Sequence, residues 1–149
     1  MNIEDIAFNT GYPEIDTDHE NIISAFKTIS HLETYQDTIS RINAVEQFLD
    51  YATNHLDREE KLMRQIGYPG YNKHIEAHRI LQEAFLAVVK EALKGKAPHD
   101  EVLRSFTSIF LGHSASDDVA LATWIEAQPR PSSRKRHVHS TQGNHRGPK

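Results

Sequence analysis

The chain of 149 residues is long enough for one domain with a substantial apolar core and short for two. Apolar residues make up 38% and charged residues 26%, as in ordinary globular proteins, and no apolar run approaches the roughly 20 residues of a membrane span. Because cysteine is absent, disulfides, iron–sulfur clusters and cysteine nucleophiles are excluded, and any metal must be held by nitrogen and oxygen atoms. The ten histidines are therefore the first compositional signal to follow.

Charge is distributed unevenly along the chain. The formal net charge is −4, but six of the 17 basic residues and none of the 21 acidic residues follow Gln128. We expect residues 1–128 to form one acidic domain that does not bind nucleic acid. Residues 129–149 have the composition of a disordered basic tail, which either remains solvated or contacts an acidic partner. The acidic N-terminus has no secretory signal, which favours a cytoplasmic location.

Helical periodicity appears in four segments, and the alternation typical of strands is absent. The predicted helices span about residues 17–33, 37–66, 71–94 and 98–127. Thr17 and Glu20 have capping-box spacing, and Gly67, Gly95 and Pro129 are stop signals after the later helices. The inward positions are expected to be Ile22, Ile23, Phe26, Ile29, Ile42, Val45, Leu49, Ala52, Leu56, Met63, Ile66, Ile75, Leu81, Phe85, Val88, Ala92, Val102, Phe106, Ile109, Phe110, Leu121 and Trp124.

Short connections between the predicted helices make consecutive helices antiparallel neighbours. The sequence therefore predicts an all-α, up-down-up-down four-helix bundle. An irregular arm is expected over residues 1–16.

Histidines and carboxylates interrupt the apolar stripes of all four predicted helices. They include pairs four residues apart, which place two side chains on one helical face: His19, His55 with Glu59, His74 with His78, and His113 followed by Asp117 and Asp118. With a rise of about 1.5 Å per residue, all of them fall near the same end of an up-down-up-down bundle. Any one of these residues by itself is better explained as a surface or core residue. Their joint convergence indicates a metal site.

The donor set exceeds what a single tetrahedral zinc ion needs and suits two first-row transition metal ions bridged by carboxylates. Histidine-rich ligation favours oxygen binding over oxygen activation. The last carboxylate stays open on geometry: in an ideal helix Asp117 lies about 40° from His113 and Asp118 about 140°.

The ordered set of motifs resembles the bacterial hemerythrins. It consists of GYPEIDTDH (11–19), HLDREEKLM (55–63), GYP (67–69), HIEAH (74–78) and HSASDD (113–118). Each motif is weak singly, but their order is highly specific, and the resemblance covers residues 8 to about 127. It implies a non-haem, oxo- or hydroxo-bridged di-iron centre that binds O2.

The resemblance also assigns the ligands. His74, His78 and His113 would hold one iron, His19 and His55 the other, and Glu59 and Asp118 would bridge them; O2 would bind at an open position on the second iron. Two features depart from the family. Ile109-Phe110 stands where a Trp-Leu pair is usual, which places Phe110 near the ligand pocket, and Phe8 replaces an N-terminal tryptophan.

These observations favour an oxygen carrier, storage or delivery protein that is not an enzyme. The alternatives are an oxygen or redox sensor, a di-iron enzyme with peroxidase or nitric-oxide-reducing activity, and a zinc-bound structural protein. His31 and His99 are expected on the surface, and His137, His139 and His145 in the tail.

Overall fold

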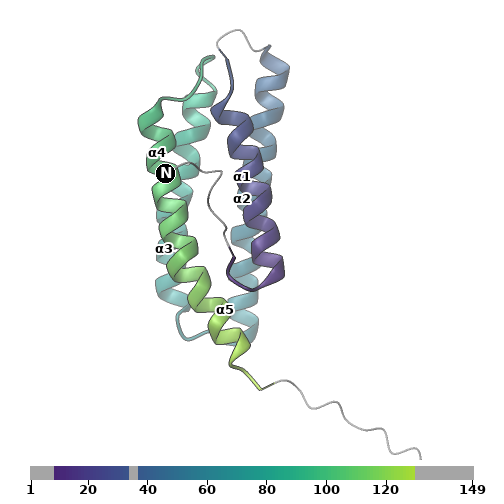
Figure 1. Cartoon of the computed structure of the whole chain (residues 1–149), viewed down its shortest axis with the longest axis vertical. Helices are drawn as coiled ribbons and strands as arrows, with labels where there is room; N and C mark the ends of the chain where they lie inside the picture. The colour runs from purple at the N-terminus through teal and green to yellow at the C-terminus, as the bar shows by residue number, and fades with distance from the viewer. Residues whose placement is uncertain (1–8, 34–36, 130–149) are drawn as a thin grey trace, which may run out of the picture.

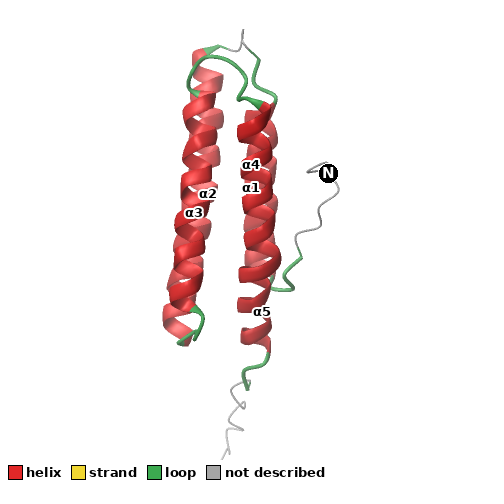
Figure 2. Ribbon diagram, turned by 90° about the vertical axis from the view of Figure 1, so that its left-hand side faces the viewer, coloured by secondary structure: helices red, strands yellow, loops and turns green. Residues whose placement is uncertain are grey.

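The computed structural model describes residues 9–33 and 37–129, which form a bundle of helices along one long axis (Figure 1). In chain order the helices are α1 (Pro13–Ser30), α2 (Thr38–Ile66), α3 (Tyr71–Ala92), α4 (Asp100–His113), the π-helical segment η2 (Ser114–Asp118) and α5 (Val119–Glu126). Because α4, η2 and α5 form one continuous rod, the bundle has four rods. Figure 2 shows the α2–α3 connection at one end and the α1–α2 and α3–α4 connections at the other. The predicted all-α four-helix bundle is confirmed.

The first helix begins earlier than predicted. Pro13 occupies its first turn, where the N–H that proline lacks would have no partner in the helix and where its fixed φ angle suits helical backbone. Thr17 and Glu20 lie inside α1, so the capping-box prediction is wrong. The irregular arm predicted for residues 1–16 is wrong for residues 13–16, and residues 1–8 lie outside the described part.

Asp16 fixes the turn that leads into α1. Its carboxylate accepts hydrogen bonds from the backbone N–H and the hydroxyl of Thr10, both at 2.7 Å, and from the Gly11 N–H at 3.2 Å. Gly11 has a φ of 85°, which side chains with a Cβ rarely adopt. The turn therefore has both a side-chain anchor and a residue suited to its backbone.

The ends of α2 agree closely with the predictions, whereas those of the later helices differ slightly. Asp37 caps α2 by accepting a hydrogen bond from the Ser40 N–H at 2.9 Å, and Gly67 ends it with a φ of 65°. The third helix ends at Ala92 rather than near residue 94, and α4 begins at Asp100 rather than near residue 98.

Two apolar clusters fill the interior. The larger includes Leu32, in the α1–α2 connection, and Ala44, near the start of α2, and contains five phenylalanines: Phe26, Phe48, Phe85, Phe106 and Phe110. The smaller, formed by Ile15, Met63 and Leu121, packs against Tyr68 in the α2–α3 connection. The predicted inward residues are buried or half-buried with one exception, since Ile42 is 42% exposed.

Arg41 is the buried residue at that level of α2. Its guanidinium donates hydrogen bonds to the carbonyl oxygens of Ala92 at 2.9 Å, Lys96 at 3.0 Å and Glu33 at 2.6 Å. It therefore joins the start of α2 to the chain segments on either side, and the next residue, Ile42, is turned toward solvent.

No helix in the described ranges combines the length and the apolar character needed to cross a bilayer. Residues 130–149 lie outside those ranges, so the disorder expected of the tail stays a prediction.

Candidate metal centre

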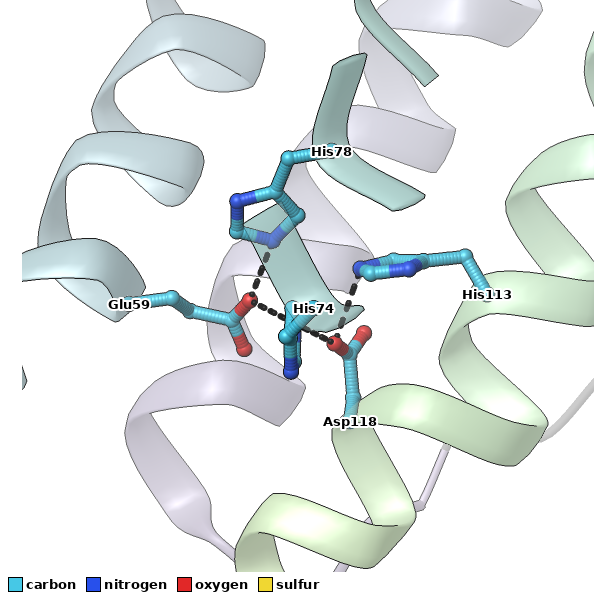
Figure 3. A group of neighbouring side chains, drawn as sticks. All are labelled: Glu59, His74, His78, His113 and Asp118. Carbon is cyan, nitrogen blue, oxygen red and sulfur yellow. Dashed lines mark hydrogen bonds and ion pairs between the residues drawn. The ribbon is translucent and has the colours of Figure 1, made fainter. Parts of the chain in front are cut away.

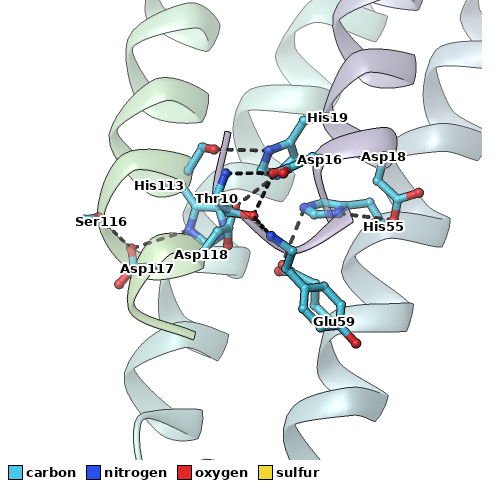
Figure 4. A network of polar contacts seen from close by, with 12 residues as sticks. Thr10, Asp16, Asp18, His19, His55, Glu59, His113, Ser116, Asp117 and Asp118 are labelled. Atoms are coloured by element: carbon cyan, nitrogen blue, oxygen red, sulfur yellow. Dashed lines mark hydrogen bonds and ion pairs between the residues drawn. The ribbon is translucent and has the colours of Figure 1, made fainter. Parts of the chain in front are cut away.

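Five histidines and two carboxylates gather between the two apolar clusters, and all seven are at most 5% exposed. Figure 3 shows five of them, Glu59, His74, His78, His113 and Asp118, and Figure 4 shows His19 and His55. They are the seven residues predicted from the sequence: His19 from α1, His55 and Glu59 from α2, His74 and His78 from α3, His113 from α4 and Asp118 from η2. All four rods contribute, so the folded bundle is required to assemble the group.

Glu59 and Asp118 lie at the centre of the group. Glu59 Oε2 is 3.0 Å from His78 Nε2 and 3.2 Å from His74 Nε2. Asp118 Oδ1 is 2.9 Å from His113 Nε2 and 3.1 Å from His74 Nε2, and Asp118 Oδ2 is 3.0 Å from His19 Nε2. His55 Nε2 is more distant, at 3.8 Å from Glu59 Oε2. Every one of the five imidazoles thus turns Nε2 inward.

The donor atoms form two overlapping sets, and within each set the atoms lie within 4.8 Å of one another. The larger set contains Glu59, His74, His78, His113 and Asp118; the smaller contains His19, His55 and Asp118. Since Asp118 belongs to both, the arrangement can hold two neighbouring metal ions that share a carboxylate.

The π-helical segment explains how Asp118 reaches the cluster. The Val119 N–H bonds to the Ser114 carbonyl, five residues earlier, so the turn contains one more residue than an α-helical turn. Residues five apart then share a face, and Asp118 lies beside His113 with no exposed surface. Asp117 is turned to the outer side of the same imidazole, with Oδ2 3.4 Å from His113 Nδ1. An ideal helix, which favoured Asp117, was the wrong geometry for this turn.

The electrostatics of the group favour bound cations. Burial opposes ionisation of Glu59, but hydrogen bonds from His74 and His78 outweigh it and hold the pKa of this carboxyl at about 2. Burial likewise opposes charge on Asp118, yet its histidine neighbours keep its pKa well below the usual range. Burial lowers the pKa of His74, but the carboxylates of Asp118 and Glu59 raise it to about 9. Without metal, protons thus compensate the buried carboxylates.

Four of the imidazoles also have a partner for their outer nitrogen, Nδ1. Ser114 Oγ lies 3.1 Å from His19, Asp18 Oδ2 3.5 Å from His55, Glu60 Oε1 3.2 Å from His78 and Asp117 Oδ2 3.4 Å from His113. The Ser114 and Glu60 contacts are at hydrogen-bond distance, and the Asp18 and Asp117 contacts are ion pairs. Such partners orient an imidazole so that its Nε2 faces a metal. The sequence interpretation missed Asp18, Glu60 and Ser114, and it considered Asp117 only as a ligand.

A signal for the outer carboxylates was nevertheless present. Asp18, Glu60 and Asp117 are each adjacent in sequence to a predicted ligand, namely His19, Glu59 and Asp118. Neighbouring residues on a helix point about 100° apart, so one faces the core and the other reaches the boundary with the next helix. Asp18 and Glu60 contact an imidazole of a neighbouring helix in this way, whereas Asp117 contacts His113 of its own rod.

Phe110 borders the smaller donor set. Its ring is fully buried, and its centroid lies 5.3 Å from that of His19 in an edge-on arrangement. It also stacks on Phe106 at 5.6 Å, which connects it to the large apolar cluster. His31 and His99 are exposed, as predicted, whereas Phe8 lies outside the described residues.

The residues fit a metal centre on their own chemistry. Within the described part of the chain, the buried Oε1 of Glu59 and Nε2 of His55 have no hydrogen-bond partner, and both belong to residues that face the group. Buried polar atoms are normally paired, so such orphans point to a ligand they would bind. Imidazole nitrogen and carboxylate oxygen are donors that iron accepts.

Comparisons with known proteins agree with this site. Residues 10–125 match the model of the Hemerythrin HHE cation binding domain. The chain is 32% identical over 126 residues to a bacteriohemerythrin of Stenotrophomonas maltophilia (strain R551-3), an alignment that covers 80% of this chain and 78% of the relative. No solved structure matches significantly. The buried histidine–carboxylate group and the family match together show that the chain belongs to the hemerythrin family.

Proposed function

We propose that the chain binds O2 reversibly at a centre of two iron ions, as an oxygen carrier, storage or delivery protein. The observation that carries this proposal is the pair of buried donor sets sharing Asp118, which suits two adjacent ions. His74, His78 and His113 would hold one iron and His19 and His55 the other, with Glu59 and Asp118 as bridges. The resemblance to a bacteriohemerythrin supports the choice of iron and of O2.

When bound, two ferrous ions would supply the electrons that O2 accepts reversibly. The protein contributes anionic bridges, since Glu59 and Asp118 stay ionised and reduce the cost of burying cationic metal. The smaller donor set leaves more coordination positions for a ligand. On that side, the buried Phe110 ring packs edge-on against His19, and we expect this apolar contact to limit the access of water and protons to His19.

The apolar contact of Phe110 favours a carrier over an enzyme. Asp18, a carboxylate outside the seven proposed ligands, contacts His55 on this side, and it is held in an ion pair with Arg58. The cytoplasmic location, and an acidic partner for the basic tail, stay predictions from the sequence.

The test is to load the metal-free chain with ferrous iron without oxygen, count the iron, and then admit and remove air while recording the visible spectrum. We expect two irons per chain and a charge-transfer band that appears with O2 and fades when O2 is removed. His55→Ala should lose the second iron and the band, whereas the matched control His31→Ala, at an exposed histidine, should keep both. Irreversible oxidation of a fully loaded protein would contradict the carrier function, and turnover with peroxide or nitric oxide would favour the enzyme.

A further inference from the structure

The two donor sets are unequal in number and in origin. The larger set offers five buried residues, which come from α2, α3 and the α4–η2 rod. The smaller offers His19, His55 and the shared Asp118, and it includes the only ligand proposed on α1. An ion in the smaller set therefore has fewer donors and depends on how firmly α1 is held against α2.

An ion pair between Asp18 and Arg58 joins α1 to α2 at this level, beside the edge-on contact of the His19 and His55 rings. Asp18 Oδ2 lies 3.5 Å from His55 Nδ1 (Figure 4). The same oxygen accepts a hydrogen bond from Arg58 Nε at 3.0 Å, and Arg58 Nη2 donates to Asp18 Oδ1. The guanidinium thus donates to both oxygens of the carboxylate, a geometry that restricts the orientation of the Asp18 side chain. Asp18 is thereby fixed on the outer side of His55, so that Nε2 of this imidazole faces the cluster.

The same contact borders an opening toward the site. A cavity of about 280 Å³ between α1 and α2 is lined by Tyr12, Ile15, Asp18, Arg58, Glu59 and Leu62, among others. It has both a proposed bridging ligand and the Asp18–Arg58 pair in its wall. Arg58 is 56% exposed at its side chain, whereas Asp18 is only 11% exposed. Solvent and ions can thus approach Glu59 and the Asp18–Arg58 pair from this side.

We propose that the centre binds its two metal ions with unequal affinity, and that the Asp18–Arg58 pair sets the affinity of the weaker position by holding His55. The stronger position is the five-residue set, and the weaker one is the set around His19 and His55. This inference rests on the proposed two-metal centre but not on O2 binding. Asp18 acts through His55 and is a positioning residue.

The structure provides a matched control on the other side of the centre. Glu60 Oε1 lies 3.2 Å from His78 Nδ1, and Glu60 Oε2 lies 3.6 Å from Arg64 Nη2. This is the same succession of imidazole, carboxylate and arginine, but it supports a ligand of the larger set. Asp18→Asn and Glu60→Gln therefore remove equivalent charges beside different metal positions.

The experiment titrates the full-length, metal-free chain with Zn2+ by calorimetry, counts bound ions by native mass spectrometry, and follows their release to a chelator. For the unmodified chain we expect two binding steps and two release phases. Asp18→Asn should weaken the second step by about 10–100-fold and leave the first within about twofold, as expected for loss of an outer partner of a metal ligand. Arg58→Gln should weaken the second step by less than Asp18→Asn does. Asp18→Glu, which keeps the carboxylate, should also weaken the second step less than Asp18→Asn does.

Glu60→Gln should instead weaken the first step. A merely structural role for Asp18 would lower both steps together and reduce the melting temperature of the metal-free chain. Equal weakening of both steps, no change in either, or a single step in the unmodified chain would overturn the inference. Two unequal Zn2+ steps without reversible O2 binding would leave it standing and contradict only the proposed oxygen function.

Discussion

The two parts of the bundle interior are built on the same four helical rods but are closed by different chemistry. In the large apolar cluster, Phe26, Phe48, Phe85 and Phe106 pack with ring centroids 4.4–6.1 Å apart. Such side chains gain free energy by leaving water and by close contact, and they need no further partner. This half of the interior is complete with the residues it has.

The adjoining polar layer is not complete in the same sense. It buries two carboxylates and five imidazoles, and burying charge is costly unless opposite charge is supplied. Protons supply it in the metal-free chain, and metal ions would replace them. Helical periodicity therefore decides which residues face inward, whereas their chemical type decides whether the layer is stable without an added cation.

Among the variants that test this difference between the polar layer and the apolar cluster, Asp118→Asn is expected to have the largest effect on metal affinity. This carboxylate belongs to both donor sets, so its loss removes a ligand from each position and an anion from the layer. We expect metal affinity to fall by more than the roughly 100-fold upper range for outer partners. Iron content per chain after desalting measures the effect.

Asp117→Asn is the control, because Asp117 contacts only the outer nitrogen of His113 among the proposed ligands. It should reduce affinity by less than Asp118→Asn does. If the two variants exchange their effects, Asp117 is the ligand and the assignment of Asp118 is wrong.

Phe106→Ala tests the other half of the interior. Phe106 is 1% exposed and contacts four other rings, so truncation leaves a cavity in the large cluster. We expect the free energy of unfolding to fall by about 3–5 kcal/mol in urea denaturation, with the number of bound metal ions unchanged under folding conditions. Phe106→Leu should lower the free energy of unfolding by less than Phe106→Ala does. Loss of metal from a folded Phe106→Ala chain would show that metal binding depends on the packing of the large apolar cluster.

A smaller effect is expected from pH in the metal-free chain. The pKa of His74 is raised from 6.5 to about 9, so its stabilising contribution is full below pH 6.5 and is lost as pH rises through 9. That contribution is up to about 3 kcal/mol. Urea midpoints at pH 6 and pH 9 should show the loss, and His74→Gln should reduce it.

Glu59 gives the opposite dependence at low pH. Its pKa is lowered from 4.5 to about 2, so its contribution to stability is present above pH 4.5 and is lost as pH falls through 2.

Metal loading should reverse the loss of stability that the metal-free chain shows as pH rises from 6.5 to 9. Metal must displace the proton on His74, so it binds more tightly as pH rises through this range. A metal-loaded chain that loses stability in that range would contradict this account.

Much of the fold was predictable because the helices follow strong local rules. The apolar periodicity identified all four rods, and Asp37 and Gly67 marked the ends of α2 correctly. The start of α1 was misplaced because the Thr17–Glu20 spacing resembles a cap, while Pro13 was the effective signal. Ile42 was predicted to face inward because periodicity does not anticipate a buried, fully hydrogen-bonded arginine at the adjacent position.

For the site, the sequence located the seven inner residues but not the shell behind them. His55 and Glu59 could be placed by spacing within one helix, and the structure brings them together with the other five. The contact from Asp18 to His55 depends on how two helices are placed relative to each other, which spacing within one helix does not contain. The resemblance to the bacterial hemerythrins selected Asp118 over Asp117, whereas ideal helical periodicity favoured Asp117 because it does not describe a π-helical turn.

The extra residue in η2 also determines which face of the following helix, α5, points toward the interior of the bundle. In an uninterrupted α-helix each added residue rotates the downstream segment by about 100°. Leu121 and Ala122 are buried after this rotation, and Leu121 completes the small apolar cluster that closes the end of the bundle. Deleting one residue from Ser114–Asp118 would therefore turn the buried face of α5 toward solvent as well as moving Asp118. The number of residues in this turn therefore determines both the position of Asp118 in the metal centre and the packing of α5 against the small apolar cluster. A change in that number would disturb both at once.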